Sequence, residues 1–245
     1  MKESFYNVQM NITDLHNVID ECDRILDSSS THTLYFLNAH CFNVAQKDKQ
    51  YYKALANADL LLNDGIGLKI ASYFTRVKFK ENLNGTDLIP KITELAARKK
   101  KKVFFMGGKE GIAQKAAIKT KENIPELYIS GFHSGYFDAN QEKALIKQIN
   151  DSGTDLLVIG MGVPLQELWA EKNKHLLTNV KLIIAGGAIL DFLSGTVRRA
   201  PGWMQKSGLE WVYRLALEPK RMWRRYLIGN VIFFWHIFRL KLNYD

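Results

Sequence analysis

The chain has 245 residues, 47% of them apolar and 24% charged, which fits one large domain with a sizeable core and excludes disordered and low-complexity classes. Its two cysteines, Cys22 and Cys41, form no Cys-x-x-Cys motif, so we expect neither a disulfide framework nor a cysteine zinc site. Lys and Arg number 34 against 25 Asp and Glu, and the net charge of +9 indicates a negatively charged partner.

The first 195 residues alternate between strand-like and helical patterns. The N-terminal segment 1–11 is polar and lacks the apolar core of a secretory signal. Helical patterns cover Leu88–Lys99, Gln141–Ile149 and Leu165–Leu177. Short apolar runs, several of them typical of strands buried on both faces, cover Leu34–Leu37, Leu60–Leu62, Val103–Met106, Leu127–Ile129, Leu156–Ile159 and Leu182–Ile184. The alternation predicts an α/β core, residues 1–195, with a parallel sheet flanked by helices.

Residues 196–245, here called the appendage, have a different character. They hold ten Lys or Arg against three Asp or Glu, and four of the five tryptophans, so +7 of the net charge lies there. From Glu218 onward, apolar residues recur at helical spacing beside Arg, Trp and Tyr. The longest apolar run, Leu227–Phe238, is shorter than the roughly 20 residues of a membrane span. We expect a cytoplasmic protein whose amphipathic helices lie in a membrane interface, although interleaved Arg and aromatic residues also suit nucleic acid.

Polar residues and glycines follow most of the predicted strands, where ligands of parallel α/β sheets bind. These residues are Asn38, Asp64, Gly107, Gly108, Gly162, Gln166, Gly186, Gly187 and Asp191. Glycine clusters permit close backbone approach and leave helix N-terminal N–H groups free for phosphate oxygens. None forms a Walker A loop or a Gly-x-Gly-x-x-Gly motif, and each alone fits a structural turn. Together they favour a nucleotide-like ligand about as much as a purely structural role.

Three side chains are candidates for chemistry. Asp64 directly follows a strand, where it can act as a general base or serve as a helix N-cap. Gln166 lies in a first helical turn, where it either contacts a ligand or faces solvent. Arg199, beside another arginine and just before a proline, is well placed to clamp a diphosphate. The histidines show no metal-ligand spacing, so we expect no metal site.

Several motifs occur together in the order found in one enzyme family. They are Asn63-Asp64-Gly65-Ile66-Gly67, Asn84-Gly85-Thr86-Asp87-Leu88, Val103-Phe104-Phe105-Met106-Gly107-Gly108, Gly160-Met161-Gly162-Val163-Pro164-Leu165-Gln166-Glu167, Arg199-Ala200-Pro201 and Glu210-Trp211-Val212-Tyr213-Arg214. From Leu34 to Tyr226 the chain resembles the WecG/TagA/CpsF glycosyltransferases. The Gly-x-Gly-x-Pro-x-Gln-Glu and Glu-Trp-x-Tyr-Arg elements are specific in combination.

The resemblance implies an inverting, metal-independent enzyme with a Rossmann-like fold and no cofactor. Enzymes of this family move a sugar from a UDP-sugar to a polyprenyl-diphosphate-linked sugar at the cytoplasmic membrane face. The teichoic acid member transfers N-acetylmannosamine to lipid-linked N-acetylglucosamine. By the same resemblance, the appendage docks on the membrane, nucleic acid is not a partner, and homo-oligomers of the core are compatible with function.

The resemblance also implies roles for individual residues. Asp64 matches the proposed base, and Asn38 and Gln166 match residues of the site. In the family, arginines of the C-terminal appendage are thought to complete the site when the enzyme docks on the membrane. The residues of this chain that match them are Arg214, Arg221 and Arg224. The other expected substrate-binding residues, from the shared motifs and the strand ends, are Asn84, Thr86, Asp87, Gly107, Gly108, Gly162, Gly186, Gly187, Asp191 and Arg199.

Two positions depart from the teichoic acid enzymes. Phe36 stands where they have Thr, and Asn82 stands where they tend to carry Arg. Both positions lie close to the expected sugar and phosphate site, so the reaction class holds while the donor sugar stays open between N-acetylmannosamine, another hexose and a uronic acid. Two alternatives from other classes are a nucleotide-binding module whose appendage binds nucleic acid, and a membrane-associated scaffold.

Overall fold

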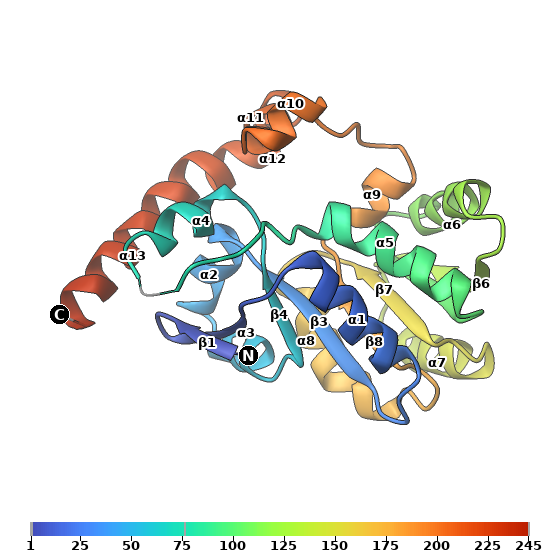
Figure 1. Ribbon diagram of the computed structural model, residues 1–245. Coiled ribbons are helices and arrows are strands. Elements are labelled where there is room, and N and C mark those ends of the chain that lie inside the picture. Colours follow the sequence, from blue (N-terminus) through green and yellow to red (C-terminus); the bar gives the residue numbers. More distant parts are fainter. Residues whose placement is uncertain (1, 76, 245) are drawn as a thin grey trace.

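Six parallel strands form the central sheet of the computed structural model, which describes residues 2–75 and 77–244 (Figure 1). The strands are β3 (His32–Leu37), β4 (Leu60–Asn63), β5 (Lys102–Gly107), β6 (Tyr128–His133), β7 (Leu156–Gly160) and β8 (Leu182–Ala185). They lie in the order β4-β3-β8-β7-β5-β6, and every neighbouring pair is parallel. The six predicted strands are confirmed.

Helices cover both faces of the sheet because the strands bury side chains on both sides. In β3, Leu34 and Phe36 pack into one core, while Tyr35 and Leu37 pack into the other. The first core is covered by α1 (Leu15–Leu26), α5 (Gly85–Arg98), α6 (Ile112–Asn123) and α9 (Ile189–Leu193). The second is covered by α2 (Ala39–Ala45), α3 (Lys49–Ala56), α7 (Ala139–Asp151) and α8 (Leu165–Asn173), which the short helix η1 (Lys174–Leu176) extends. The predicted parallel sheet flanked by helices is confirmed.

An N-terminal hairpin, which the sequence pattern did not predict, covers one edge of the sheet. It pairs β1 (Lys2–Phe5) with β2 (Val8–Asn11) in antiparallel register. Phe5, Val8 and Met10 are buried in the second core. The Asn11 side chain accepts a hydrogen bond from the backbone N–H of Leu61 at 2.9 Å, so the hairpin is fixed to β4.

Crevices open at the carboxyl edge of the sheet, where successive helices diverge. Helix α2 follows β3 toward one face, and α9 follows the neighbouring strand β8 toward the other. The helices after β5 and β7, which are also neighbours, diverge in the same way. Such points are the usual ligand sites of open α/β sheets.

The appendage folds into helices, and its last helix packs on the core. These helices are α10 (Gly202–Lys206), α11 (Glu210–Leu217), α12 (Pro219–Trp223), the π-helical turn η2 (Arg224–Ile228) and α13 (Gly229–Tyr244). Helix α13 lies against α2 and against α4 (Ile66–Ser72), and it buries Phe233 and Ile237 in the second core (Figure 1). Among the described residues, no helix has the length and apolar character needed to cross a membrane.

Candidate active site

Two cavities share a wall at the carboxyl edge of the sheet. The larger, about 610 Å³, lies between the loops after β5, β7 and β8 and the helices α11 and α12. The smaller, about 310 Å³, lies between α4, α11 and α13. The residues that line both are Asn38, Asp64, Thr86, Phe192, Arg214 and Arg225. Two ligands bound side by side would therefore meet at this shared wall.

Asp64 is the carboxylate at the shared wall. Its backbone N–H donates to the carbonyl of Leu37 at 2.8 Å, which fixes it beside the end of β3. Helix α4 begins after Gly65 with no side-chain cap, so the interpretation of Asp64 as an N-cap is wrong. Burial raises the pKa of Asp64, and the hydrogen bond from Asn38 and the positive charge of Arg225 oppose that rise. A carboxylate in this state is well suited to accept a proton.

Asn38 orients the Asp64 carboxylate. It caps α2, with its Oδ1 accepting from the backbone N–H of Cys41 at 3.1 Å. The cap leaves the amide nitrogen to donate to Asp64 Oδ2 at 3.2 Å. Asn38 thereby links the end of β3 to the end of β4.

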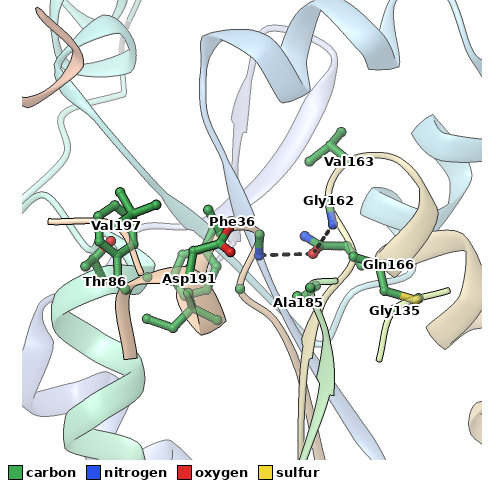
Figure 2. Close-up of a pocket in the computed structure, with 18 of the residues that line it drawn as sticks. Phe36, Thr86, Gly135, Gly162, Val163, Gln166, Ala185, Asp191 and Val197 are labelled. Carbon is green, nitrogen blue, oxygen red and sulfur yellow. Dashed lines mark hydrogen bonds between the residues drawn. The ribbon is translucent and has the colours of Figure 1, made fainter. Parts of the chain in front are cut away.

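Gln166 connects the loops after the neighbouring strands β7 and β8 in the wall of the larger cavity. Its Oε1 accepts from the backbone N–H of Gly187 at 3.0 Å and of Gly162 at 3.2 Å (Figure 2). The residue is 2% exposed, so the alternative that it faces solvent is wrong. In Figure 2, Thr86, Asp191 and Val197 lie on the opposite side of the cavity from Gln166.

The glycines at the strand ends divide into two groups. Gly108, Gly162, Gly186 and Gly187 line the larger cavity, and their approach to a ligand stays a prediction. Gly107 lies outside both cavities and has φ 144°, and a Cβ there would come within 2.3 Å of the Gly160 carbonyl oxygen. Gly107 therefore allows the ends of β5 and β7 to pack closely together.

Three arginines of the appendage line the larger cavity. They are Arg214 of α11, Arg221 of α12 and Arg225 of η2. The Nε atoms of Arg214 and Arg225 are buried and meet no acceptor within the described part of the chain. Buried guanidinium donors without an acceptor suit an anionic ligand, such as a diphosphate.

The remaining predicted residues are distributed around this centre. Asn84 caps α5 through the backbone N–H of Asp87 and lines the smaller cavity, while Thr86 lines both. Burial raises the pKa of Asp191 in the larger cavity, and the nearby charge of Arg221 opposes that rise. Across residues 2–75 and 77–244, His, Cys, Asp and Glu side chains form no group of three that could hold a metal ion.

Three other predicted residues lie outside the cavities. Arg199 forms ion pairs with Asp87 and, at 3.2 Å, with Glu210, which connects α5 to α11. Arg224 is exposed, and its guanidinium lies 5.3 Å from the centre of the Trp223 ring. The substrate-binding roles of Arg199, Asp87 and Arg224 stay predictions.

Sequence comparison with known proteins identifies the family. The family model described as "Glycosyl transferase WecG/TagA/CpsF family" matches residues 3–245. The chain belongs to this family. It is 31% identical over 227 residues, 92% of this chain and 87% of the relative, to the N-acetylglucosaminyldiphosphoundecaprenol N-acetyl-beta-D-mannosaminyltransferase of Bacillus subtilis (strain 168). A protein of the same name in Bacillus spizizenii is 33% identical over 75% of this chain and 70% of the relative. Another in Staphylococcus aureus (strain NCTC 8325) is 25% identical over 98% of this chain and 93% of the relative.

One arginine at the cavities of this glycosyltransferase is not among the predicted site residues. Arg225 lines both cavities and acts electrostatically on Asp64. Its signal in the sequence is its place in the cluster of Arg221, Arg224 and Arg225, which does not separate it from Arg224. Lys109, in the loop after β5, is a further cation of the larger cavity that was not predicted.

The two departures from the teichoic acid enzymes both lie at the site of this glycosyltransferase. Phe36 is 6% exposed and lines the larger cavity. Asn82 lines the smaller cavity, and its Oδ1 accepts from the backbone N–H of Gly65 at 2.7 Å. Asn82 thereby stabilises the turn that carries Asp64.

Proposed function

We propose that this glycosyltransferase transfers N-acetylmannosamine to N-acetylglucosaminyl-diphospho-undecaprenol, as the names of its relatives describe, and that its donor is the UDP-sugar. The observation that carries the proposal is the position of Asp64. It is the one carboxylate, among the described residues, that lines both cavities. A base at that point lies between a donor in one cavity and an acceptor in the other.

The UDP-sugar occupies the larger cavity in this proposal. The backbone around Gly108 and Gly187 approaches its diphosphate closely. Arg214, Arg221 and Arg225 face it from the appendage. Because these cations border the leaving group, they stabilise the charge that develops on UDP without a metal ion.

The chemical step is a single displacement. Asp64 takes the proton of the acceptor hydroxyl as that oxygen forms a bond to the anomeric carbon of the donor. The bond from the anomeric carbon to the UDP oxygen breaks, and UDP leaves with the electron pair. Attack from the face opposite UDP inverts the anomeric configuration.

The acceptor sugar occupies the smaller cavity, which α4 and α13 border with apolar side chains. Ile70 of α4 and Phe234 of α13 line that cavity. The exposed apolar side chains of α4, of the two residues after it and of α13 are Ile70, Tyr73, Phe74, Val231, Trp235, Phe238 and Leu242, here called the docking stripe. We propose that the stripe enters the interface of the cytoplasmic membrane, where the polyprenyl chain of the acceptor resides.

The donor is tested by offering a panel of UDP-sugars with lipid-linked N-acetylglucosamine and measuring UDP release. UDP-N-acetylmannosamine should be the active donor. Because Phe36 and Asn82 lie at the site, the panel includes UDP-N-acetylglucosamine, UDP-glucose and UDP-glucuronic acid. A preference for one of these would contradict the proposed donor, and release of UDP from none would contradict transfer itself.

Membrane docking is tested by point substitution. Deleting the appendage would also remove Phe233 and Ile237 from the core, so it is an unsuitable test. The double variant Trp235→Ser and Phe238→Ser should lose most binding to anionic liposomes in a flotation assay. The matched control replaces Ile118 and Phe132, which are exposed on α6 and β6, with Ser. Equal binding of the two double variants would contradict the docking stripe.

A further inference from the structure

Glu167 is a buried carboxyl in the wall of the larger cavity. It lies in the first turn of α8 and is 1% exposed. Its Oε1 accepts from the Gln166 side-chain amide at 2.8 Å. Its Oε2 is buried and meets no hydrogen-bond partner within the described residues. The chemical step proposed above does not use this group.

The hydrogen bond from Gln166 to Glu167 fixes the orientation of the Gln166 amide. A side-chain amide presents an acceptor on one side and two donors on the other. Because Nε2 donates to Glu167, Oε1 faces the N–H groups of Gly162 and Gly187. A flipped amide would set its NH₂ against those two donors and its oxygen against a carboxylate. Glu167 thus stabilises the one orientation that holds the two loops together.

The surroundings of Glu167 favour its neutral form. Burial raises its pKa to about 7, against the opposing hydrogen bond from Gln166. Tyr35 of β3, Cys41 of α2 and Tyr51 of α3 feel its charge, and burial raises the pKa of each of these three groups. The charged groups nearby are Glu171 of α8, which accepts a hydrogen bond from the Tyr35 hydroxyl, and Arg225 of η2, whose positive charge acts on Cys41 and Tyr51.

We infer that Glu167 is a positioning residue: by orienting Gln166, it holds the Gly162 and Gly187 loops at the spacing that receives the donor diphosphate. The inference rests on the proposed function, because it places the donor in the larger cavity. Glu167 acts through Gln166.

Ionisation of Glu167 should change the affinity for UDP, an effect that a purely structural side chain would not have. An ionised Glu167 adds a negative charge to the wall of a cavity that receives a diphosphate. Affinity for UDP should therefore fall as the pH rises through the pKa of about 7. Coulomb repulsion across a partly screened cavity corresponds to a change of about three- to tenfold in Kd.

The experiment measures the Kd of UDP by calorimetry at pH 6 and pH 8. The phosphate groups of UDP also titrate, but they do so equally with every variant. Glu167→Gln keeps an acceptor oxygen for Gln166 and cannot ionise, so its ratio of Kd at pH 8 to Kd at pH 6 should be about three- to tenfold smaller than that of the wild type. Glu167→Ala removes the acceptor and should weaken UDP binding at both pH values. Glu171→Gln, one turn further along α8, is the matched control and should keep the wild-type ratio.

The outcomes separate the inference from the proposed function. A Glu167→Ala variant that binds UDP as tightly as the wild type at both pH values would overturn the inference alone, and so would a Glu167→Gln variant with the wild-type pH ratio. So would a Glu171→Gln variant that loses the ratio to the same extent. A wild-type protein that binds no UDP would overturn the proposed function, and the inference with it.

Discussion

Replacing Arg225 with Ala tests the assignment of the donor cavity. Arg225 lies in the π-helical turn η2 and lines both cavities. Its Nε is buried and meets no acceptor within the described residues, so this one donor is already shielded from water when an anion arrives. Its positive charge also lowers the pKa of His40, which burial brings to about 4, so His40 stays neutral at pH 7. Arg225 is therefore the principal cation beside Asp64.

The expected magnitude follows from this placement. Removing one preorganised donor to a developing negative charge costs about 10²–10³ in turnover, or about 2.7–4 kcal/mol. Arg225→Ala should fall in this range, because the charge on UDP develops in a partly buried cavity. The variant should stay folded, since the side chain forms no ion pair with the rest of the described chain.

The assay is steady-state release of UDP with lipid-linked acceptor. Lys220→Ala, an exposed substitution on α12 outside both cavities, controls for the loss of one positive charge from the appendage. It should retain turnover within about threefold of the wild type, since exposed charges contribute little. An Arg225→Ala variant that lost no more turnover than Lys220→Ala would refute the reasoning.

The pH dependence of turnover, the packing of Gly107 and the response to a chelator can each be measured. Turnover should fall as the pH drops through the raised pKa of Asp64, because the base must be ionised. Asn38→Ala should move this fall to higher pH, since it removes a hydrogen bond that lowers the pKa of Asp64. An unmoved pH profile would contradict the role of Asn38. Gly107→Ala should lower the free energy of unfolding by about 3 kcal/mol in urea titrations. Gly111, with φ 77°, has open space where a Cβ would lie, so Gly111→Ala should lower it by about 1 kcal/mol. Equal losses would contradict the close packing of β5 on β7. EDTA should leave turnover unchanged, because arginines supply the positive charge, and a loss restored by added Mg²⁺ would contradict this.

The sheet could be predicted from the sequence because its strands are buried on both faces. Runs such as Val103–Met106 are apolar at consecutive positions, as strands buried on both faces are, so they can be recognised in the sequence without knowledge of their tertiary contacts. The hairpin of β1 and β2 could not be predicted. Its two strands have four residues each, and Phe5, Val8 and Met10 become buried only against the rest of the fold.

The candidate site was predictable where it depends on strand ends. Asp64 and Asn38 follow strands directly, so the parallel topology alone brings them together. Arg225 was missed because a π-helical turn changes which side chains of α12 and α13 share a face, and no sequence pattern marks that turn. Arg199 was expected at the diphosphate, but its interaction with Asp87 and Glu210 depends on how α5 and α11 pack.

The rate of UDP release by Asp64→Asn tests the central claim most directly. The substitution keeps the size of the side chain and removes its ability to accept a proton. With UDP-N-acetylmannosamine and lipid-linked N-acetylglucosamine, turnover should fall at least about a hundredfold, while UDP binding and thermal stability are kept. Near-normal turnover by this variant would contradict the assignment of Asp64 as the base.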